Sequence, residues 1–131
     1  MRYITILFVL LMIASAADRD LSGKYAGEWK SNSSGGNGSF RLSLDPGAAG
    51  AWKCEVVFTF GGEDVKTVMR EVKVDQSKLE AAYDFNLLGN PLRSRITGEW
   101  NGKAFEGRYQ TTAVDGGTAV DDGVWSAAKA K

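Results

Sequence analysis

Several residue types are scarce or missing in this chain of 131 residues. Histidine is absent, and the only cysteine is Cys54. A single thiol cannot form a disulfide within one chain, so stability has to come from a packed core. No catalytic, metal-binding or nucleotide-binding motif stands out from the rest of the sequence. We therefore expect no enzymatic activity, no metal site and no cofactor.

The chain also lacks a surplus of charge of either sign. It carries 16 lysines and arginines against 16 aspartates and glutamates, and the two signs are interspersed. Nucleic acids and anionic membrane surfaces are bound by clustered lysine and arginine. The charge pattern therefore argues against both kinds of partner.

A single apolar run, residues 4–13, stands at the N-terminus. Arg2 precedes it, and the small-x-small pattern that signal peptidases cut ends at Ala16. The run is too short to cross a bilayer as a helix, although a retained membrane anchor is the alternative. We expect residues 1–16 to be a signal peptide cleaved near Ala16. Residues 17–131 would then form one secreted or periplasmic domain without a membrane span.

One stretch sets the pattern for the rest of the chain. Residues 92–100 alternate apolar and polar side chains, and residues 104–112 do so again. A period of two predicts strands with one apolar and one polar face. Asn101-Gly102 lies between them, a dipeptide typical of a tight type I′ turn. We therefore predict a β-hairpin with a two-residue turn.

The same alternation recurs along most of the chain. The other predicted strands are residues 24–31, 39–44, 51–60, 65–74, 79–87 and 120–127. The apolar phase changes within 65–74, which predicts a bulge near residues 69–71. Residues 78–85 would also suit a helical turn by propensity, but the strict alternation favours a strand. The fold class predicted is all-β, an antiparallel up-and-down meander of about eight strands closing into a small barrel.

Four predicted strands place a glycine two positions before an aromatic ring on the same face. These units are Gly27-x-Trp29, Gly98-x-Trp100, Gly107-x-Tyr109 and Gly123-x-Trp125. Glycine weakens a strand unless the missing side chain is needed, for example for sharp coiling with a ring covering the gap. One unit lies in the first strand and three lie in the last three strands. We expect these strands to meet where the barrel closes.

The segment LSGKYAGEW at residues 21–29 and the later GEW, GRY and GVW triplets carry a family resemblance. On these residues the chain resembles the small exported eight-stranded barrels of the lipocalin and avidin type, the calycins. The resemblance implies a barrel in which Trp29, from the G-x-W of the first strand, packs across one end. It implies no particular ligand.

All twelve aromatic residues of 17–131 fall on the face predicted to point inward. A small barrel is either filled by its own side chains or holds one small ligand, and so many rings favour a filled core. If a cavity exists, we expect a small apolar or aromatic molecule, or a short peptide, at one barrel mouth. The candidate ligand-binding residues are Tyr25, Trp29, Tyr83, Ser94, Trp100, Tyr109, Thr111 and Trp125.

The second hypothesis is an interaction module with a filled core, such as an inhibitor or an envelope-associated protein. It would bind a protein partner through the polar loops at residues 32–38, 45–50 and 115–119. Asn32 and Asn37 stand in N-x-S patterns that allow glycosylation in a eukaryote, although a polar hairpin loop explains the same residues.

Three further features have ordinary structural interpretations. Cys54 shares its phase with apolar residues and suits a buried position, with an intermolecular disulfide or a reactive thiol as alternatives. Asp121 and Asp122 lack the spacing of a calcium loop and are expected in a turn. Glu99 and Glu106 are expected to form cross-strand ion pairs with arginines on a solvated face, rather than a catalytic pair. The same outward charges argue against an outer-membrane barrel.

Overall fold

The computed structural model describes residues 21–130, which form one antiparallel sheet of nine strands. The predicted signal peptide, residues 1–16, lies outside the described residues. The elements are β1 (Gly23–Ser31), β2 (Asn37–Pro46), the short 3₁₀ turn η1 (Ala48–Gly50), β3 (Trp52–Phe60), β4 (Glu63–Lys66), β5 (Val68–Asp75), β6 (Lys78–Leu87), β7 (Asn90–Trp100), β8 (Ala104–Ala113) and β9 (Ala119–Lys129).

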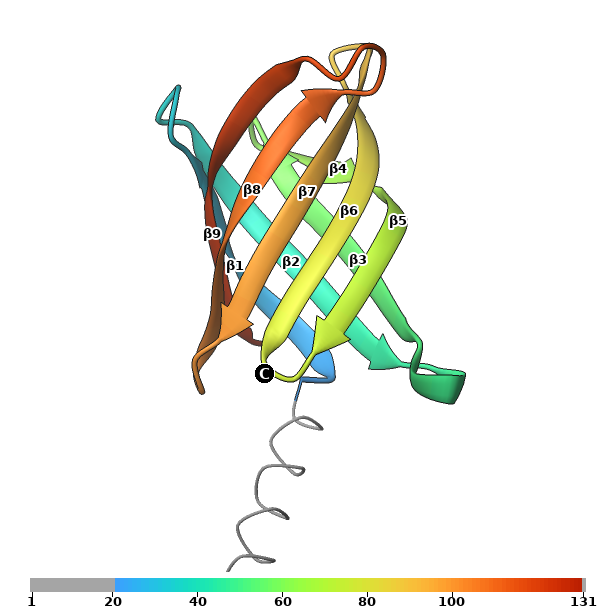
Figure 1. Ribbon diagram of the computed structural model, residues 1–131. Helices are drawn as coiled ribbons and strands as arrows, with labels where there is room; N and C mark the ends of the chain where they lie inside the picture. The colour runs from blue at the N-terminus through green and yellow to red at the C-terminus, as the bar shows by residue number, and fades with distance from the viewer. Residues whose placement is uncertain (1–20, 131) are drawn as a thin grey trace, which may run out of the picture.

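The sheet curls into a nearly closed barrel (Figure 1). Its spatial order is β4-β3-β2-β1-β9-β8-β7-β6-β5, so the first and last strands pair inside the sheet. Trp29 of β1 lies opposite Trp125 of β9 in this pairing. The predicted all-β antiparallel meander and the meeting of the first and last strands are confirmed. Within residues 21–130, no helix has the length and apolar character needed to cross a membrane.

The predicted strand at residues 65–74 is divided at Thr67. The part before the break, β4, pairs with β3, and the part after it, β5, pairs with β6. The Thr67 hydroxyl donates a hydrogen bond to the Val56 carbonyl at 2.7 Å and ties the break to β3. The predicted bulge is confirmed between Met69 and Glu71. This division gives nine strands in place of about eight, and it makes the two edges of the sheet consecutive in the chain.

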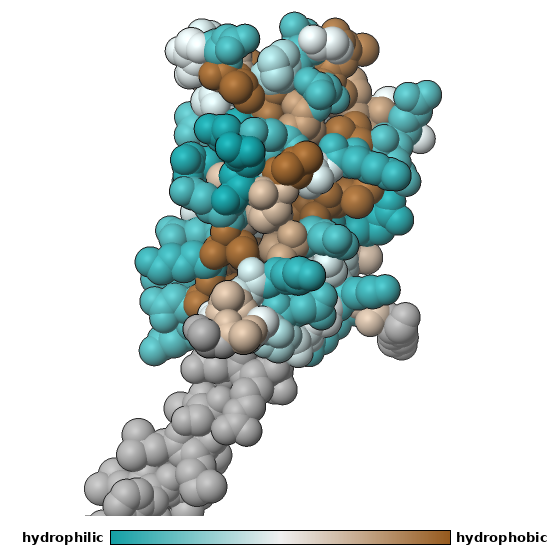
Figure 2. Space-filling model, turned by 90° about the vertical axis from the view of Figure 1, so that its right-hand side faces the viewer, coloured by the Kyte–Doolittle hydropathy of each residue, from teal (hydrophilic) through white to brown (hydrophobic). Residues whose placement is uncertain are grey.

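The side of the barrel that carries β5 shows apolar patches between polar groups at the surface (Figure 2). Val68, directly after the break, is exposed, whereas Met69, Val72 and Val74 are half-buried and pack against the core. The outer face of the barrel is therefore less polar at the interrupted edge than a fully alternating strand would make it.

The turn between β7 and β8 is centred one residue later than predicted. The Asn101 N–H donates to the Ala104 carbonyl at 3.0 Å, which encloses Gly102 and Lys103. The Asn101 side-chain oxygen accepts from the N–H groups of Lys103 and Ala104, each at 2.9 Å. Gly102 has a positive φ of 98° and Asn101 does not. The predicted type I′ turn at Asn101-Gly102 is wrong, because the two residues that the turn encloses are Gly102 and Lys103.

Aromatic rings pack together at the lower end of the barrel, where β7 ends and β8 begins. Tyr25, Trp100 and Phe105 form a cluster with ring centroids 5.0–5.7 Å apart. Trp125 lies next to this cluster, 6.1 Å from Phe105 and 4.9 Å from Phe40, which lies on the far side of β1 in β2. Such edge-on and tilted ring pairs are the arrangements that aromatic side chains prefer.

Two glycines let the sheet coil tightly around these rings. A Cβ on Gly107 would lie 1.8 Å from the Thr97 carbonyl oxygen, and a Cβ on Gly98 would lie 2.5 Å from the Trp125 ring. Neither position has room for a side chain, because the neighbouring backbone or ring already occupies the space. The glycine and ring pattern in the sequence therefore corresponds to close contact across the sheet.

Candidate ligand-binding site

A cavity of about 290 Å³ opens at the upper end of the barrel, among the loops that join β1 to β2 and β8 to β9. One wall is aromatic and comes from β1, β2 and β3, with Trp29, Phe40, Phe58 and Phe60. The indole N–H of Trp29 donates to the Thr59 carbonyl at 2.9 Å, which fixes the plane of its ring. The prediction of a filled core is therefore wrong for the upper half, where the facing strands carry Ser94, Thr111 and Asp121 beside Phe85 and Leu92 and a cavity remains.

The opposite wall carries a continuous row of polar groups. Tyr83, Ser94, Thr111 and Asp121 lie directly opposite one another in register across β6, β7, β8 and β9. The hydroxyls of Ser94 and Thr111 are 2.6 Å apart and hydrogen-bonded. All four side chains line the cavity. We call this row the polar belt.

The turn expected at Asp121 is wrong, whereas the predicted strand at residues 120–127, which contains Asp121, is confirmed. The residue lies within β9, where it shares the inward phase of Gly123 and Trp125. Its Oδ1 accepts hydrogen bonds from the hydroxyls of Ser31 at 2.7 Å and Ser33 at 2.9 Å. The alternation of β9 was the signal that would have identified it, since Asp121 stands four residues before Trp125.

The other carboxylate oxygen of Asp121 accepts from the Tyr109 hydroxyl at 2.9 Å. Burial, followed by this hydrogen bond and the nearby negative charge, raises the pKa of Tyr109 above its usual range. Burial also raises the pKa of Tyr83, against the effect of its hydrogen bond with Ser94. Both phenols therefore remain protonated at neutral pH and act as neutral hydrogen-bonding groups.

The eight candidate residues fall into two groups. Those that line the cavity are Trp29, Tyr83, Ser94, Tyr109, Thr111 and Trp125. Tyr25 and Trp100 lie instead in the ring cluster at the lower end, where the Tyr25 hydroxyl donates to the Leu21 carbonyl. The cavity residues that were not among the candidates include Asp121 and three rings of the aromatic wall, Phe40, Phe58 and Phe60.

One of the three suspected loops borders the cavity, since Ser33 and Ser34 of residues 32–38 line it. The backbone N–H of Asn32 donates to the Asp122 carbonyl at 2.9 Å, which joins the β1–β2 loop to β9. Residues 45–50 lie at the opposite end (Figure 1). Four exposed apolar side chains surround the cavity end, and we call them the rim. They are Phe60, Leu88, Val114 and Val120.

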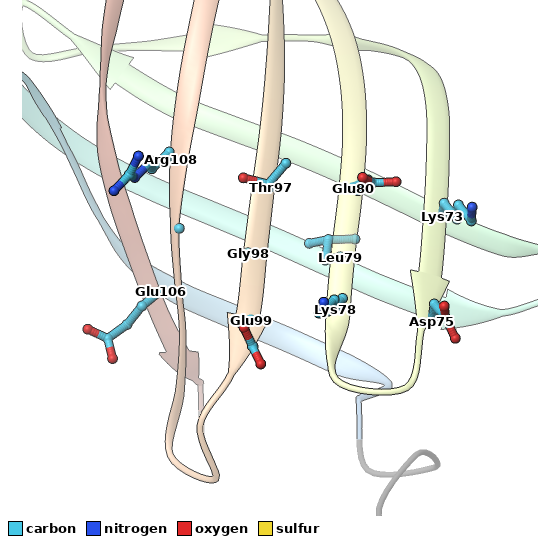
Figure 3. A pocket seen from close by; sticks show the side chains of 11 residues that line it. Lys73, Asp75, Lys78, Leu79, Glu80, Thr97, Gly98, Glu99, Glu106 and Arg108 are labelled. Carbon is cyan, nitrogen blue, oxygen red and sulfur yellow. The ribbon is translucent and has the colours of Figure 1, made fainter.

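A second hollow, of about 470 Å³, lies on the outer face of β5 to β8 (Figure 3). Charged side chains of both signs project from it into solvent. Glu99 and Glu106 face each other across β7 and β8, and within residues 21–130 neither forms an ion pair. Their predicted pairing with arginine is wrong, because Arg95 pairs with Glu71 at 3.1 Å on the other side. This hollow is a solvated surface that carries charges of both signs.

The clearest ion pair on the outer face joins Arg93 and Asp84. The two side chains form two hydrogen bonds, at 2.6 and 3.0 Å. These bonds to Arg93 lower the pKa of the Asp84 carboxyl. The expected ion pairs between strands are therefore present, but they stabilise β6 against β7 rather than β7 against β8.

Cys54 is a free, buried thiol in β3. Burial, with a smaller contribution from Glu55, raises its pKa to about 12. A thiol in that state is a poor nucleophile, because the thiolate is the reactive form. Across the described part of the chain, no group of three or more His, Cys, Asp or Glu side chains is arranged to hold a metal ion.

The fold and the cavity together define a small antiparallel β-barrel with an open, half-aromatic and half-polar mouth. No protein-family model, no curated protein sequence and no solved structure matches this chain. Function has to be inferred from the chemistry of the cavity and its surroundings.

Proposed function

We propose that this protein is an exported, non-enzymatic barrel of the lipocalin and avidin type that binds a small apolar or aromatic molecule, or a short peptide, at its upper mouth. The observation that carries the proposal is the cavity, with its aromatic wall on one side and its polar belt on the other. Small-molecule sites typically combine apolar walls with a few polar groups that set orientation. At about 290 Å³ the cavity suits a ligand with one or two rings.

The G-x-W of the first strand supports the same proposal. Trp29 packs at one end of the barrel, where its ring centroid lies 6.4 Å from Phe58 and 6.2 Å from Tyr109. In the proposed export route, residues 1–16 are removed and the barrel acts outside the cytoplasm, in the periplasm or after secretion.

Native mass spectrometry of the protein purified gently from its own source tests this function. A reproducible excess mass that disappears on denaturation is the expected result. Val120→Trp should abolish the excess mass, because Val120 lies at the exposed rim and lines the cavity. Val124→Trp is the matched control, since Val124 is exposed on the outer face of the same strand.

A bare protein mass, together with no binding of small aromatic probes to the purified barrel, would reject ligand binding. Equal loss of ligand from Val120→Trp and Val124→Trp would instead mean that the ligand sits elsewhere. The two readouts therefore test the presence of a ligand and its position separately.

The second candidate is an interaction module that captures a protein partner with the same end of the barrel. The rim favours it, because four large apolar side chains are exposed together beside two polar loops. Shortening residues 115–119, none of which lines the cavity, should abolish capture of such a partner and leave binding of a small molecule largely intact.

A further inference from the structure

We infer that the molecule bound at the mouth carries a single positive charge, an amine held by Asp121 with its apolar or aromatic body against the opposite wall. This inference rests on the proposed function and names the ligand class. It starts from the charges around the cavity. Asp121 is the one acidic residue among those lining the cavity, and no lysine or arginine lines it.

The hydrogen bonds to Asp121 solvate its charge but do not neutralise it. All three donors are hydroxyl groups, from Ser31, Ser33 and Tyr109. Within residues 21–130, no lysine or arginine forms an ion pair with Asp121. A carboxylate held inside a mostly apolar cavity is most stable when a cation restores neutrality. An amine-bearing ligand supplies that charge.

The geometry leaves a place for the amine. Oδ1 of Asp121 accepts two hydrogen bonds, whereas Oδ2 accepts one, from Tyr109. Each carboxylate oxygen has about two acceptor positions, so Oδ2 retains one for an ammonium N–H. A charge-assisted bond of this kind is stronger than the bond a neutral ligand would form.

The aromatic groups beside Asp121 favour a cation as well. Tyr109 binds Asp121 and packs edge-on against Trp29, with ring centroids 6.2 Å apart. A cation near the faces of such rings is attracted by their negative π-density. An anion would be repelled by both the carboxylate and the rings, which predicts selectivity by charge.

Three probes with the same phenyl body test the charge requirement on the unmodified protein. They are 2-phenylethylammonium, neutral propylbenzene and the anion 3-phenylpropanoate, and binding is measured by ligand-observed NMR and calorimetry. We expect the cation to bind about tenfold more tightly than propylbenzene, a difference of about 1.4 kcal/mol. We expect no measurable binding of the anion.

The outcomes separate this inference from the function on which it rests. Equal affinity for the cation and propylbenzene, or tighter binding of the neutral probe, would overturn the charge requirement and leave a cavity that binds apolar molecules. Failure of all three probes to bind, with no ligand in native mass spectra, would overturn the proposed function itself.

A substitution then locates the charge. Asp121→Asn should lower the affinity for the cation to that of propylbenzene, with the affinity for propylbenzene unchanged. Asp122→Asn is the matched control, because Asp122 is the next residue of β9 and is exposed. Retained preference for the cation in a folded Asp121→Asn protein would overturn the assignment to Asp121. The probe series on the unmodified protein stands even if that variant fails to fold.

Discussion

The two halves of this barrel are built by the same strands but differ in what fills them. In the lower half, Tyr25, Trp100 and Phe105 pack ring against ring. In the upper half, the inward positions of β6 to β9 carry the polar belt, and a cavity of about 290 Å³ remains.

The difference shows how one fold separates stability from binding. Large rings on facing strands bury apolar area and hold the lower half together. Hydroxyls and a carboxylate at equivalent inward positions contribute less burial, but they leave space and polar groups for a ligand. Trp125 lies between the two, because it contacts Phe105 below and lines the cavity above.

The largest expected effect is a loss of stability caused by a substitution in the lower half. Phe105→Ala removes a ring that is 0% exposed, so we expect the free energy of unfolding to fall by ~3–5 kcal/mol. Denaturant unfolding followed by tryptophan fluorescence measures it. Phe60→Ala, at the rim and 41% exposed, is the control and should cost well under half as much. Equal losses would show that the upper half is as tightly packed as the lower.

The next effect comes from displacing Trp125, the ring that contacts both halves. Gly98→Ala places a Cβ 2.5 Å from the Trp125 ring, so the ring has to move. We expect a loss of ~1–3 kcal/mol in unfolding free energy, the usual range for overpacking. Ligand affinity should fall too, since Trp125 lines the cavity. Gly36→Ala, in the β1–β2 loop, is the control; unchanged binding by Gly98→Ala would mean that Trp125 does not shape the cavity.

The strand pattern and the closure of the barrel could be predicted from the sequence, because alternation and the glycine and ring units are local signals. The division at Thr67 could not, since residues 65–74 read as one strand and the break depends on which neighbours each part pairs with. The sequence named six of the residues that line the cavity, but it could not establish that a cavity exists, for a similar reason. Whether inward rings fill a barrel depends on the curvature of the sheet, and Asp121 was assigned to a turn although its phase matches Trp125.

Alkaline pH should lower the free energy of unfolding, because each half of the barrel contains a buried weak acid. Burial raises the pKa of Cys54 to about 12 and raises the pKa of Tyr83, so the unfolded chain loses these protons first. Stability is then complete below the unfolded values, about 8.5 for the thiol and 10 for the phenol, and falls as the pH rises. The slope should be ~1.4 kcal/mol per pH unit for each group.

Denaturant titrations from pH 8 to pH 11 measure this slope. Cys54→Ala should remove the loss that begins near the thiol value, and Tyr83→Phe the loss that begins near the phenol value. A stability that stays constant above about pH 9 in the unmodified protein would contradict the burial of the Cys54 thiol.

The smallest effect compares one turn at each end. Gln76 at the lower end and Leu88 at the upper end both have left-handed backbones, with φ of 57° and 53°. Leu88 is 87% exposed, so its side chain adds strain without burial. Leu88→Asn should raise the unfolding free energy by roughly 0.5–1 kcal/mol, since asparagine tolerates this conformation. A lower unfolding free energy for Leu88→Asn would show that Leu88 packs against the barrel. Weaker capture of a protein partner by the same variant would support the interaction module.

The consecutive position of β4 and β5 at the two edges has a consequence for how the chain can be rewired. The backbone N–H of Ala130 donates to the Lys24 carbonyl at 2.8 Å, so the start of β1 and the end of β9 lie side by side. A short linker could join the end of β9 to the start of β1, and the chain could be cut at Thr67 to give new termini. In this circular permutant, each strand from β5 round to β4 would pair with the next strand along the chain. The pairing of β1 with β9, the most distant in the present chain, would become a local one. Such a permutant should fold faster than the natural order, because fewer native contacts would span long stretches of chain.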